Sequence, residues 1–190
     1  MGVPIIKHEC PDCWTLLDSD KVFEADNRLR VTRQTICLPD SRIIDDYYQI
    51  DLPSFAAIYT LTEDNQVLVL QQYKHGVGRV CLTLPGGQID PGEDPEFSAR
   101  RELLEETGYG GGRWRPGPTL VLHGNQRIAK AHIYIVQKAI KLGEPASGDL
   151  EDAELITMPR AGVRQAMRMG NLPITSHVAA VGIAEALLAG

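Results

Sequence analysis

Three glutamates stand at a spacing that would place them together on one face of a helix. Glu102, Glu105 and Glu106 occupy positions i, i+3 and i+4, which lie within an arc of roughly 100° on an α-helix. Carboxylates at this spacing repel one another by roughly 0.2–0.5 kcal/mol per pair, and a divalent cation would neutralise them. Carboxylate oxygens with no His or Cys among them favour Mg²⁺, or Mn²⁺ in its place, over Zn²⁺. Taken alone, three glutamates are also typical of a solvated acidic helix.

Neighbouring residues indicate what such a cation would act on. The loop Pro85-Gly86-Gly87 would let the backbone approach the carboxylates closely, because glycine carries no side chain. Arg101 stands four residues before Glu105 and can also reach back towards Glu93. Protein-bound Mg²⁺ usually keeps waters and takes further ligands from substrate phosphates. We therefore expect a phosphate compound as the substrate, most naturally a diphosphate.

The helix that carries the glutamates has defined ends. Asp94 suits the N-cap, proline suits the first helical position, and Gly108 suits a left-handed stop, so the helix is expected over 95–107. The apolar residues outside the arc of the glutamates, which we expect to face the core, are Phe97, Leu103 and Leu104.

The rest of the chain alternates strand and helix patterns. Strands are expected over 28–37, 42–50, 54–61, 66–72, 119–122, 131–136 and 154–158. Two more helices are expected over 160–169 and 175–188. Strands placed before and around helices in this way predict a mixed sheet sandwiched by helices, in the α+β class.

Composition limits the possible function classes. The 190 residues carry a formal net charge of −6, and their number fits one domain with a small appendage. No run approaches the ~20 apolar residues of a membrane span, and the first residues lack the pattern of a secretory signal. We expect a cytoplasmic protein with no membrane partner. The acidic balance argues against nucleic acid as a partner.

The cysteines leave two interpretations open. Cys10 and Cys13 have the spacing of half a zinc site, with His8 close by, but Cys37 and Cys81 stand alone. Reduced thiols in a cytosolic protein are the favoured interpretation, and a bound zinc is the alternative.

The segment from Gly87 to Tyr109, GQIDPGEDPEFSARRELLEETGY, resembles the Nudix box, G-x5-E-x7-R-E-U-x-E-E-x-G-U, in which U is apolar. The positions that match in register are Gly87, Glu93, Arg101, Glu102, Leu103, Glu105, Glu106, Gly108 and Tyr109. So many fixed positions in one short segment favour a metal site over a solvated acidic helix.

The Nudix resemblance implies a fold, a reaction and residue roles. The fold would be an α/β/α sandwich with a mixed sheet, and the reaction would be Mg²⁺-dependent hydrolysis of a nucleoside diphosphate linked to another group. The residues that would ligate metal are Gly86, through a carbonyl oxygen, and Glu102, Glu105 and Glu106, which would also be catalytic. Glu93 and Arg101 would orient this site.

One branch of the family is similar over more of the chain. Trp14, the run LVLQQYKH over 68–75 and the run LPGG over 84–87 resemble ADP-ribose pyrophosphatases and related sugar-nucleotide hydrolases. In that branch the N-terminal strands form a small antiparallel β subdomain that is exchanged or packed across a homodimer. The resemblance therefore implies a subdomain over 1–50 that dimerises, a Nudix hydrolase domain over 51–190, and ADP-ribose as substrate, giving AMP and ribose 5-phosphate.

The acidic loop before the last predicted strand resembles the one that supplies a catalytic base in that branch. Glu151 is the first candidate for the base and Glu154 the second, and an ordinary acidic loop is the alternative. Lys74 and His75, at a strand end, are expected to meet phosphate, with surface basic residues as the alternative.

One departure from the branch concerns the substrate. The branch typically carries a proline shortly after the box, whereas 121–127 reads VLHGNQR. His123, Asn125 and Arg127 are therefore candidates for lining the substrate pocket, and a plain polar loop is the alternative. Two rival functions stay open: another Nudix pyrophosphatase, acting on NADH, an mRNA cap, a GDP-sugar or another nucleotide sugar, and a Nudix domain that senses a nucleotide sugar without cleaving it.

Overall fold

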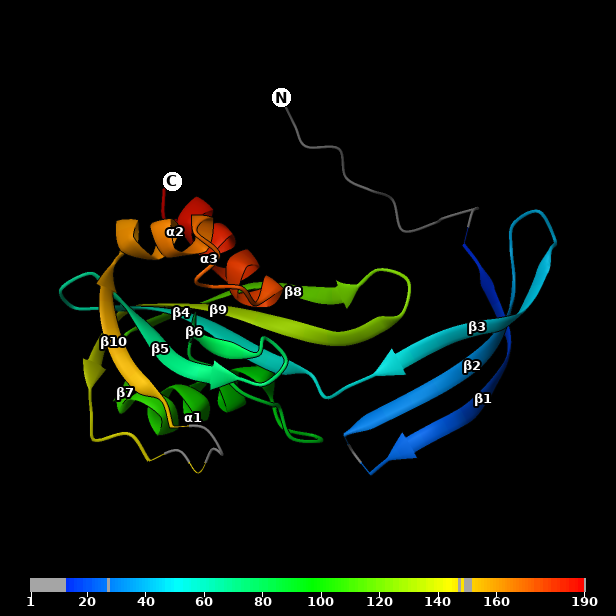
Figure 1. The fold of residues 1–190 in the computed structure, drawn as a ribbon, viewed down its shortest axis with the longest axis horizontal. Helices are drawn as coiled ribbons and strands as arrows, with labels where there is room; N and C mark the ends of the chain where they lie inside the picture. Colours follow the sequence, from blue (N-terminus) through cyan, green and yellow to red (C-terminus); the bar gives the residue numbers. More distant parts are fainter. Residues whose placement is uncertain (1–12, 27, 147, 149–151, 190) are drawn as a thin grey trace. The chain divides into compact units, whose positions relative to one another are not determined.

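The protein divides into two compact units, which are described separately. The computed structural model describes residues 13–26, 28–146, 148 and 152–189 (Figure 1). The N-terminal unit comprises Met1–Leu52 with His123–Ile128, and the main unit comprises Pro53–Leu122 with Ala129–Gly190. The expected boundary between residues 50 and 51 and the expected role of the first domain in dimerisation stay predictions.

The N-terminal unit is an antiparallel meander of three strands. These are β1 (Thr15–Ala25), β2 (Leu29–Cys37) and β3 (Ile43–Asp51). Ile50 of β3 also pairs, in parallel, with Arg127 at the start of β9. The sequence analysis missed β1, because its polar and charged residues interrupt the apolar pattern that marks a strand.

Large apolar side chains stand exposed on this meander. Every residue of β1 before Ala25 is exposed, so both of its faces are open in the part of the chain that is described. The exposed large apolar residues of the unit are Trp14, Leu16, Leu17, Val22, Phe23, Ile43, Tyr48 and Leu52. Large apolar residues gathered on an exposed surface are typical of a site that binds another protein or another element.

The main unit is built on a mixed sheet. Its strands are β4 (Phe55–Thr62), β5 (Gln66–Lys74), β6 (Arg79–Thr83), β7 (Tyr109–Gly110), β8 (Arg113–His123), β9 (Arg127–Lys141) and β10 (Glu154–Pro159). The order β9-β4-β5-β10 combines a parallel β4–β9 pair with antiparallel β4–β5 and β5–β10 pairs. Strand β6 pairs with β5, while β7 and β8 pair with β9.

Helices cover both faces of this sheet (Figure 1). They are α1 (Pro95–Thr107), α2 (Arg160–Arg168) and α3 (Thr175–Leu188). Successive side chains of β4 point to opposite faces: Tyr59 packs in the core cluster with Val181 of α3, whereas Ile58 packs in the cluster with Leu103 of α1. The α+β sandwich expected from the sequence is confirmed. No helix in the described residues is long and apolar enough to cross a membrane.

Candidate active site

Local capping fixes both ends of α1. The Asp94 carboxylate accepts hydrogen bonds from the backbone N–H groups of Glu96 and Phe97, both at 3.0 Å. Gly108 ends the helix at φ 71°, a left-handed conformation that glycine adopts without a steric penalty. Both ends lie where the sequence predicted them. The caps fix where the helix begins and ends, and therefore which face of α1 each glutamate occupies.

The buried face of α1 differs from the expected one. Leu103 is fully buried, but Phe97 is 64% exposed and Leu104 is 43% exposed. The other buried residues of the helix are small: Ser98, Ala99 and Thr107. Small side chains let the helix lie close to the sheet. The buried face of α1 therefore lies beside the face that carries the glutamates, and not opposite to it as expected. The expectation that Phe97 and Leu104 face the core was wrong.

Arg101 connects three of the predicted site carboxylates. Its guanidinium donates two hydrogen bonds to Glu93, each at 3.2 Å, and further bonds to Glu102 at 2.8 Å and Glu105 at 3.0 Å. A planar guanidinium presents several N–H donors in a fixed fork, and therefore one arginine can hold several carboxylates in register. The structure thus brings Glu93 and Arg101 together, as the sequence predicted.

These contacts also set the charge state of the pair. The hydrogen bonds from Arg101 are the largest influence that lowers the pKa of Glu93 below its ordinary value. The bonds to Glu93, followed by those to Glu102 and Glu105, raise the pKa of Arg101. At neutral pH the carboxylate is ionised and the guanidinium is charged, so Arg101 offsets part of the repulsion within the acidic cluster.

The loop 84–87 contacts two of the glutamate side chains, Glu106 and Glu102, through its backbone. The N–H of Gly86 donates to Glu106 Oε2 at 2.7 Å. Gly86 adopts φ 145°, and a Cβ there would lie 2.1 Å from the carbonyl oxygen of Ala56. A Cβ on Gly87 would lie 2.3 Å from the Glu102 carboxylate. Glycine is therefore required at position 86 for the loop to lie this close to β4, whereas at position 87 it leaves room for the Glu102 carboxylate beside the loop.

Comparison with known proteins identifies the fold and the family. A family model described as the NUDIX domain matches residues 52–177, about two thirds of the chain. The chain belongs to the Nudix family. Nudix hydrolases generally use a divalent metal, and the box residues lie on the loop before α1, on α1 itself and directly after it.

Two curated relatives and one solved structure are similar to this Nudix protein. It is similar to an ADP-sugar pyrophosphatase of Mus musculus, 32% identical over 99 residues that are 50% of this chain and 45% of the relative. It is also similar to an ADP-ribose pyrophosphatase of Saccharomyces cerevisiae, with 43% identity over 96 residues. These residues are 48% of this chain and 41% of the relative. The chain thus spans less than half the length of either relative. A crystal structure of an ADP compounds hydrolase has a TM-score of 0.78 and 19% identity, covering 93% of this chain and 95% of that one.

The donor set of the Nudix box is chemically suited to a hard divalent cation. Among the described residues, no group of three or more His, Cys, Asp or Glu is arranged as a ready metal cage. Mg²⁺ does not need such a cage, because it usually takes one or two carboxylates, with waters and substrate phosphates completing its shell. Glu102 and Glu106 are both held against the glycine loop, and Glu105 is bonded to Arg101 one turn after Glu102. The residues present therefore fit the metal.

The predicted phosphate-binding residues of the main unit lie at the end of β5. Lys74 is the last residue of the strand, and His75 begins the turn after it, with its ring 6.3 Å from that of Tyr73. The positive charge of Lys74 contributes, after burial, to the lowered pKa of His177.

The candidates from the loop after β8 belong to the N-terminal unit. Arg127 forms an ion pair with Asp51. His123 accepts a hydrogen bond from the N–H of Gln126 at 3.3 Å, and the carbonyl of Asn125 accepts one from the Tyr47 hydroxyl at 2.8 Å. Each of these three candidates is thus bound within its own unit, separate from the unit that carries the carboxylates.

The remaining predicted residues fall partly outside the described part of the chain. Glu151, the first candidate for the base, and Cys10 of the possible zinc site lie outside the described residues. Glu154, the second candidate, is the exposed first residue of β10 and lines an open pocket of about 780 Å³ with Tyr73 and Val80. Cys13 is exposed.

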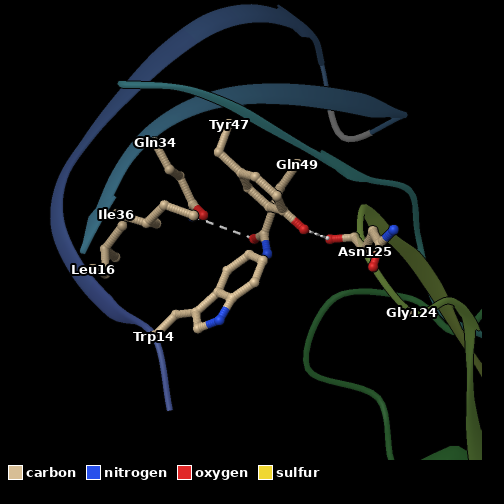
Figure 2. A pocket seen from close by; sticks show the side chains of 8 residues that line it. All are labelled: Trp14, Leu16, Gln34, Ile36, Tyr47, Gln49, Gly124 and Asn125. Carbon is tan, nitrogen blue, oxygen red and sulfur yellow. Dashed lines mark hydrogen bonds between the residues drawn. The ribbon is translucent and has the colours of Figure 1, made fainter. Parts of the chain in front are cut away.

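The sequence analysis missed a pocket within the N-terminal unit. It has a volume of about 400 Å³, and its lining residues are Trp14, Leu16, Gln34, Ile36, Tyr47, Gln49, Gly124 and Asn125 (Figure 2). The rings of Trp14 and Tyr47 meet edge to face, with centroids 5.6 Å apart. Gln34 donates to Gln49 at 3.2 Å. The sequence analysis had named two of the pocket's lining residues, Trp14 through the family resemblance and Asn125 as a candidate for the substrate pocket, but not the pocket itself.

Proposed function

We propose that this Nudix protein hydrolyses the diphosphate of a nucleoside diphosphate sugar, with ADP-ribose as first candidate and AMP and ribose 5-phosphate as products. The observation that carries the proposal is the carboxylate face of α1, in which the Gly86–Gly87 loop holds Glu102 and Glu106 while Arg101 holds Glu105. The names of the two curated relatives, an ADP-sugar and an ADP-ribose pyrophosphatase, support the substrate class.

The metal in this proposal is Mg²⁺, for which Mn²⁺ can substitute. Glu102, Glu105, Glu106 and the Gly86 carbonyl are the groups that would hold it. Bound there, the cation would polarise the diphosphate and lower the pKa of a bound water. Arg101, fixed by Glu93, keeps the carboxylates from moving apart when they carry full charge.

The chain's own residues supply the other roles. Glu151 is proposed as the general base, with Glu154 as second candidate. Lys74, His75, His123 and Arg127 are proposed as substrate-binding groups, because cationic and imidazole side chains donate to phosphate oxygens. We also propose that the protein is cytoplasmic and that it forms a homodimer, the latter because Trp14 and β1 expose large apolar side chains.

A substrate panel tests the proposal directly. ADP-ribose, GDP-sugars, UDP-sugars, NADH and a capped dinucleotide would each be incubated with the full chain and Mg²⁺, and nucleoside monophosphate release would be measured, with EDTA as the control. We expect ADP-ribose to give the highest kcat/KM and EDTA to abolish turnover. Preference for NADH or a cap would assign another Nudix reaction. Tight ADP-ribose binding in calorimetry with no product over hours would identify a sensor.

A further inference from the structure

A histidine at the start of α3 bonds to the backbone at the root of the glycine loop. The Nδ1 atom of His177 accepts a hydrogen bond from the N–H of Leu84 at 3.0 Å. Leu84 is 1% exposed and directly follows β6. The next three residues, Pro85 to Gly87, form the loop that touches the carboxylates.

The Leu84 N–H needs this acceptor because it lies beyond the sheet. The pairing of β6 with β5 ends at Thr83 opposite Leu70. A buried backbone N–H without a partner is strongly unfavourable, so nearly all such groups are paired. His177 therefore takes the place of a strand partner at the point where the chain leaves the sheet to form the loop.

The surroundings of the imidazole keep it in the form that can accept. Burial, with a further contribution from the charge of Lys74, lowers the pKa of His177 to about 4. The ring is therefore neutral at pH 7. Since Nδ1 accepts the Leu84 hydrogen, the ring proton must be on Nε2.

Further hydrogen bonds connect the loop after Leu84 to β4 and to α1. The Pro85 carbonyl accepts from the N–H of Ile58, and the Gly87 carbonyl accepts from the N–H of Ala56, both at 2.9 Å. Between them, the Gly86 N–H donates to Glu106. The loop is thus fixed along β4 by its carbonyls, at its root by His177, and on α1 by Glu106. Release of the root would let the Gly86 N–H shift relative to Glu106.

We propose that His177 is a positioning residue for the carboxylate face of α1: by binding Leu84 it fixes the glycine loop, and hence Gly86, against Glu106. This inference rests on the proposed function, because that proposal assigns the carboxylates to a metal. His177 binds the backbone at the root of the loop, and we assign it no contact with substrate or metal. Groups that hydrogen-bond directly to a metal ligand typically change metal affinity by about 10- to 100-fold when they are removed, and His177 acts on the loop that carries the Gly86 carbonyl.

Two nearly isosteric variants isolate the acceptor. In His177→Asn the amide oxygen can take the place of Nδ1, whereas His177→Leu has a similar shape and no acceptor. Mn²⁺ binding to the full chain without substrate would be measured by electron paramagnetic resonance. Hydrogen exchange of the Leu84 and Gly86 amides would be measured on the metal-free protein. We expect His177→Leu to weaken Mn²⁺ binding about 10-fold or more and to speed exchange at both amides. His177→Asn should stay within about threefold of the unchanged protein in Mn²⁺ affinity.

A control on the same helix separates positioning from general stability. Leu187→Ala removes a partly buried contact of α3 ten residues away and should lower the melting temperature while leaving Mn²⁺ affinity and Gly86 exchange unchanged. The inference is overturned if His177→Leu binds Mn²⁺ like the unchanged protein, or if Asn and Leu at this position behave alike. If the unchanged protein neither binds Mn²⁺ nor turns over any compound of the panel, the proposed function has failed instead, and amide exchange alone then reports whether His177 anchors the loop.

Discussion

At the scale of single residues, position on α1 separates carboxylates that could act on a metal from those that only solvate the helix. Glu105 and Glu106 belong to the cluster around Arg101 and the glycine loop, whereas Glu96 lies in the first turn and pairs with Arg100 at 2.6 Å on the surface. Replacing Glu105 or Glu106 by Gln keeps the shape and removes one negative charge. We expect kcat with ADP-ribose and Mg²⁺ to fall about 10²- to 10³-fold.

Glu96→Gln is the matched control for these two variants. It makes the same chemical change on the same helix, and a surface ion pair contributes only about 0–1 kcal/mol to stability. Activity and melting temperature should both stay close to those of the unchanged protein. Full Mg²⁺-dependent turnover in both Glu105→Gln and Glu106→Gln would show that the assigned roles are wrong.

Gly87 offers a second test at the scale of single residues. In Gly87→Ala the added methyl would lie 2.3 Å from the Glu102 carboxylate, which must then move, and a flexible side chain can move at small cost to stability. We expect kcat/KM to fall about 10-fold or more with almost no change in melting temperature. Gly76→Ala is the control, since nothing lies within 4 Å of its added methyl. Equal activity of the two variants would contradict close packing of Glu102 on the loop.

At the scale of elements, an ion cluster ties α2 and α3 to β4. Glu185 of α3 accepts hydrogen bonds from Arg160 and Arg164 of α2 and, at 2.5 Å, from the Tyr59 hydroxyl of β4. Burial alone would raise the pKa of Glu185, but the bonds from Arg160, Tyr59 and Arg164 outweigh it and lower the pKa. The ionised carboxylate therefore joins three elements of the main unit.

This lowered pKa predicts the direction of a pH effect. A carboxyl group whose pKa is lowered by folding contributes stability above its unfolded pKa, whose ordinary value is 4.5, and loses it as pH falls through the folded value. Glu185→Gln should lower the free energy of unfolding by about 1–3 kcal/mol at pH 7. The difference should shrink as pH drops below 4.5. Urea unfolding at several pH values measures both, and a difference that does not change with pH would contradict the assignment.

Elements with local signals were predictable, and contacts between distant segments were not. The bounds of α1 followed from Asp94 and Gly108, which act within one helical turn. Its buried face was misjudged because the pattern gave weight to large apolar residues, whereas the close approach to the sheet selects small ones. The bond between Leu84 and His177 joins positions 93 residues apart. Only the fold brings them together, so no pattern in the sequence linked the two residues.

At the scale of the whole molecule, the exposed apolar residues of the N-terminal meander predict a partner that covers them. Stable protein interfaces bury about 1,200–2,000 Å² in total, and apolar surface contributes roughly 25 cal/mol per Å² when it is removed from water. Phe23 on β1 is 52% exposed, and its apolar neighbours on the strand are exposed as well. A second copy of this chain could bury them, and light scattering after size exclusion should then give twice the chain mass of 20.9 kDa.

A charge on β1 tests whether this strand forms the interface. In Phe23→Asp the new carboxylate would have to be buried in the dimer, and an unpaired buried charge is strongly destabilising. We expect the dimer dissociation constant to rise about 10-fold or more, with the main unit still folded. Val121→Asp is the control, because this valine is 53% exposed on β8 of the main unit. A chain that runs at the monomer mass at micromolar concentrations, or two variants that dissociate equally, would show that β1 does not hold the dimer together.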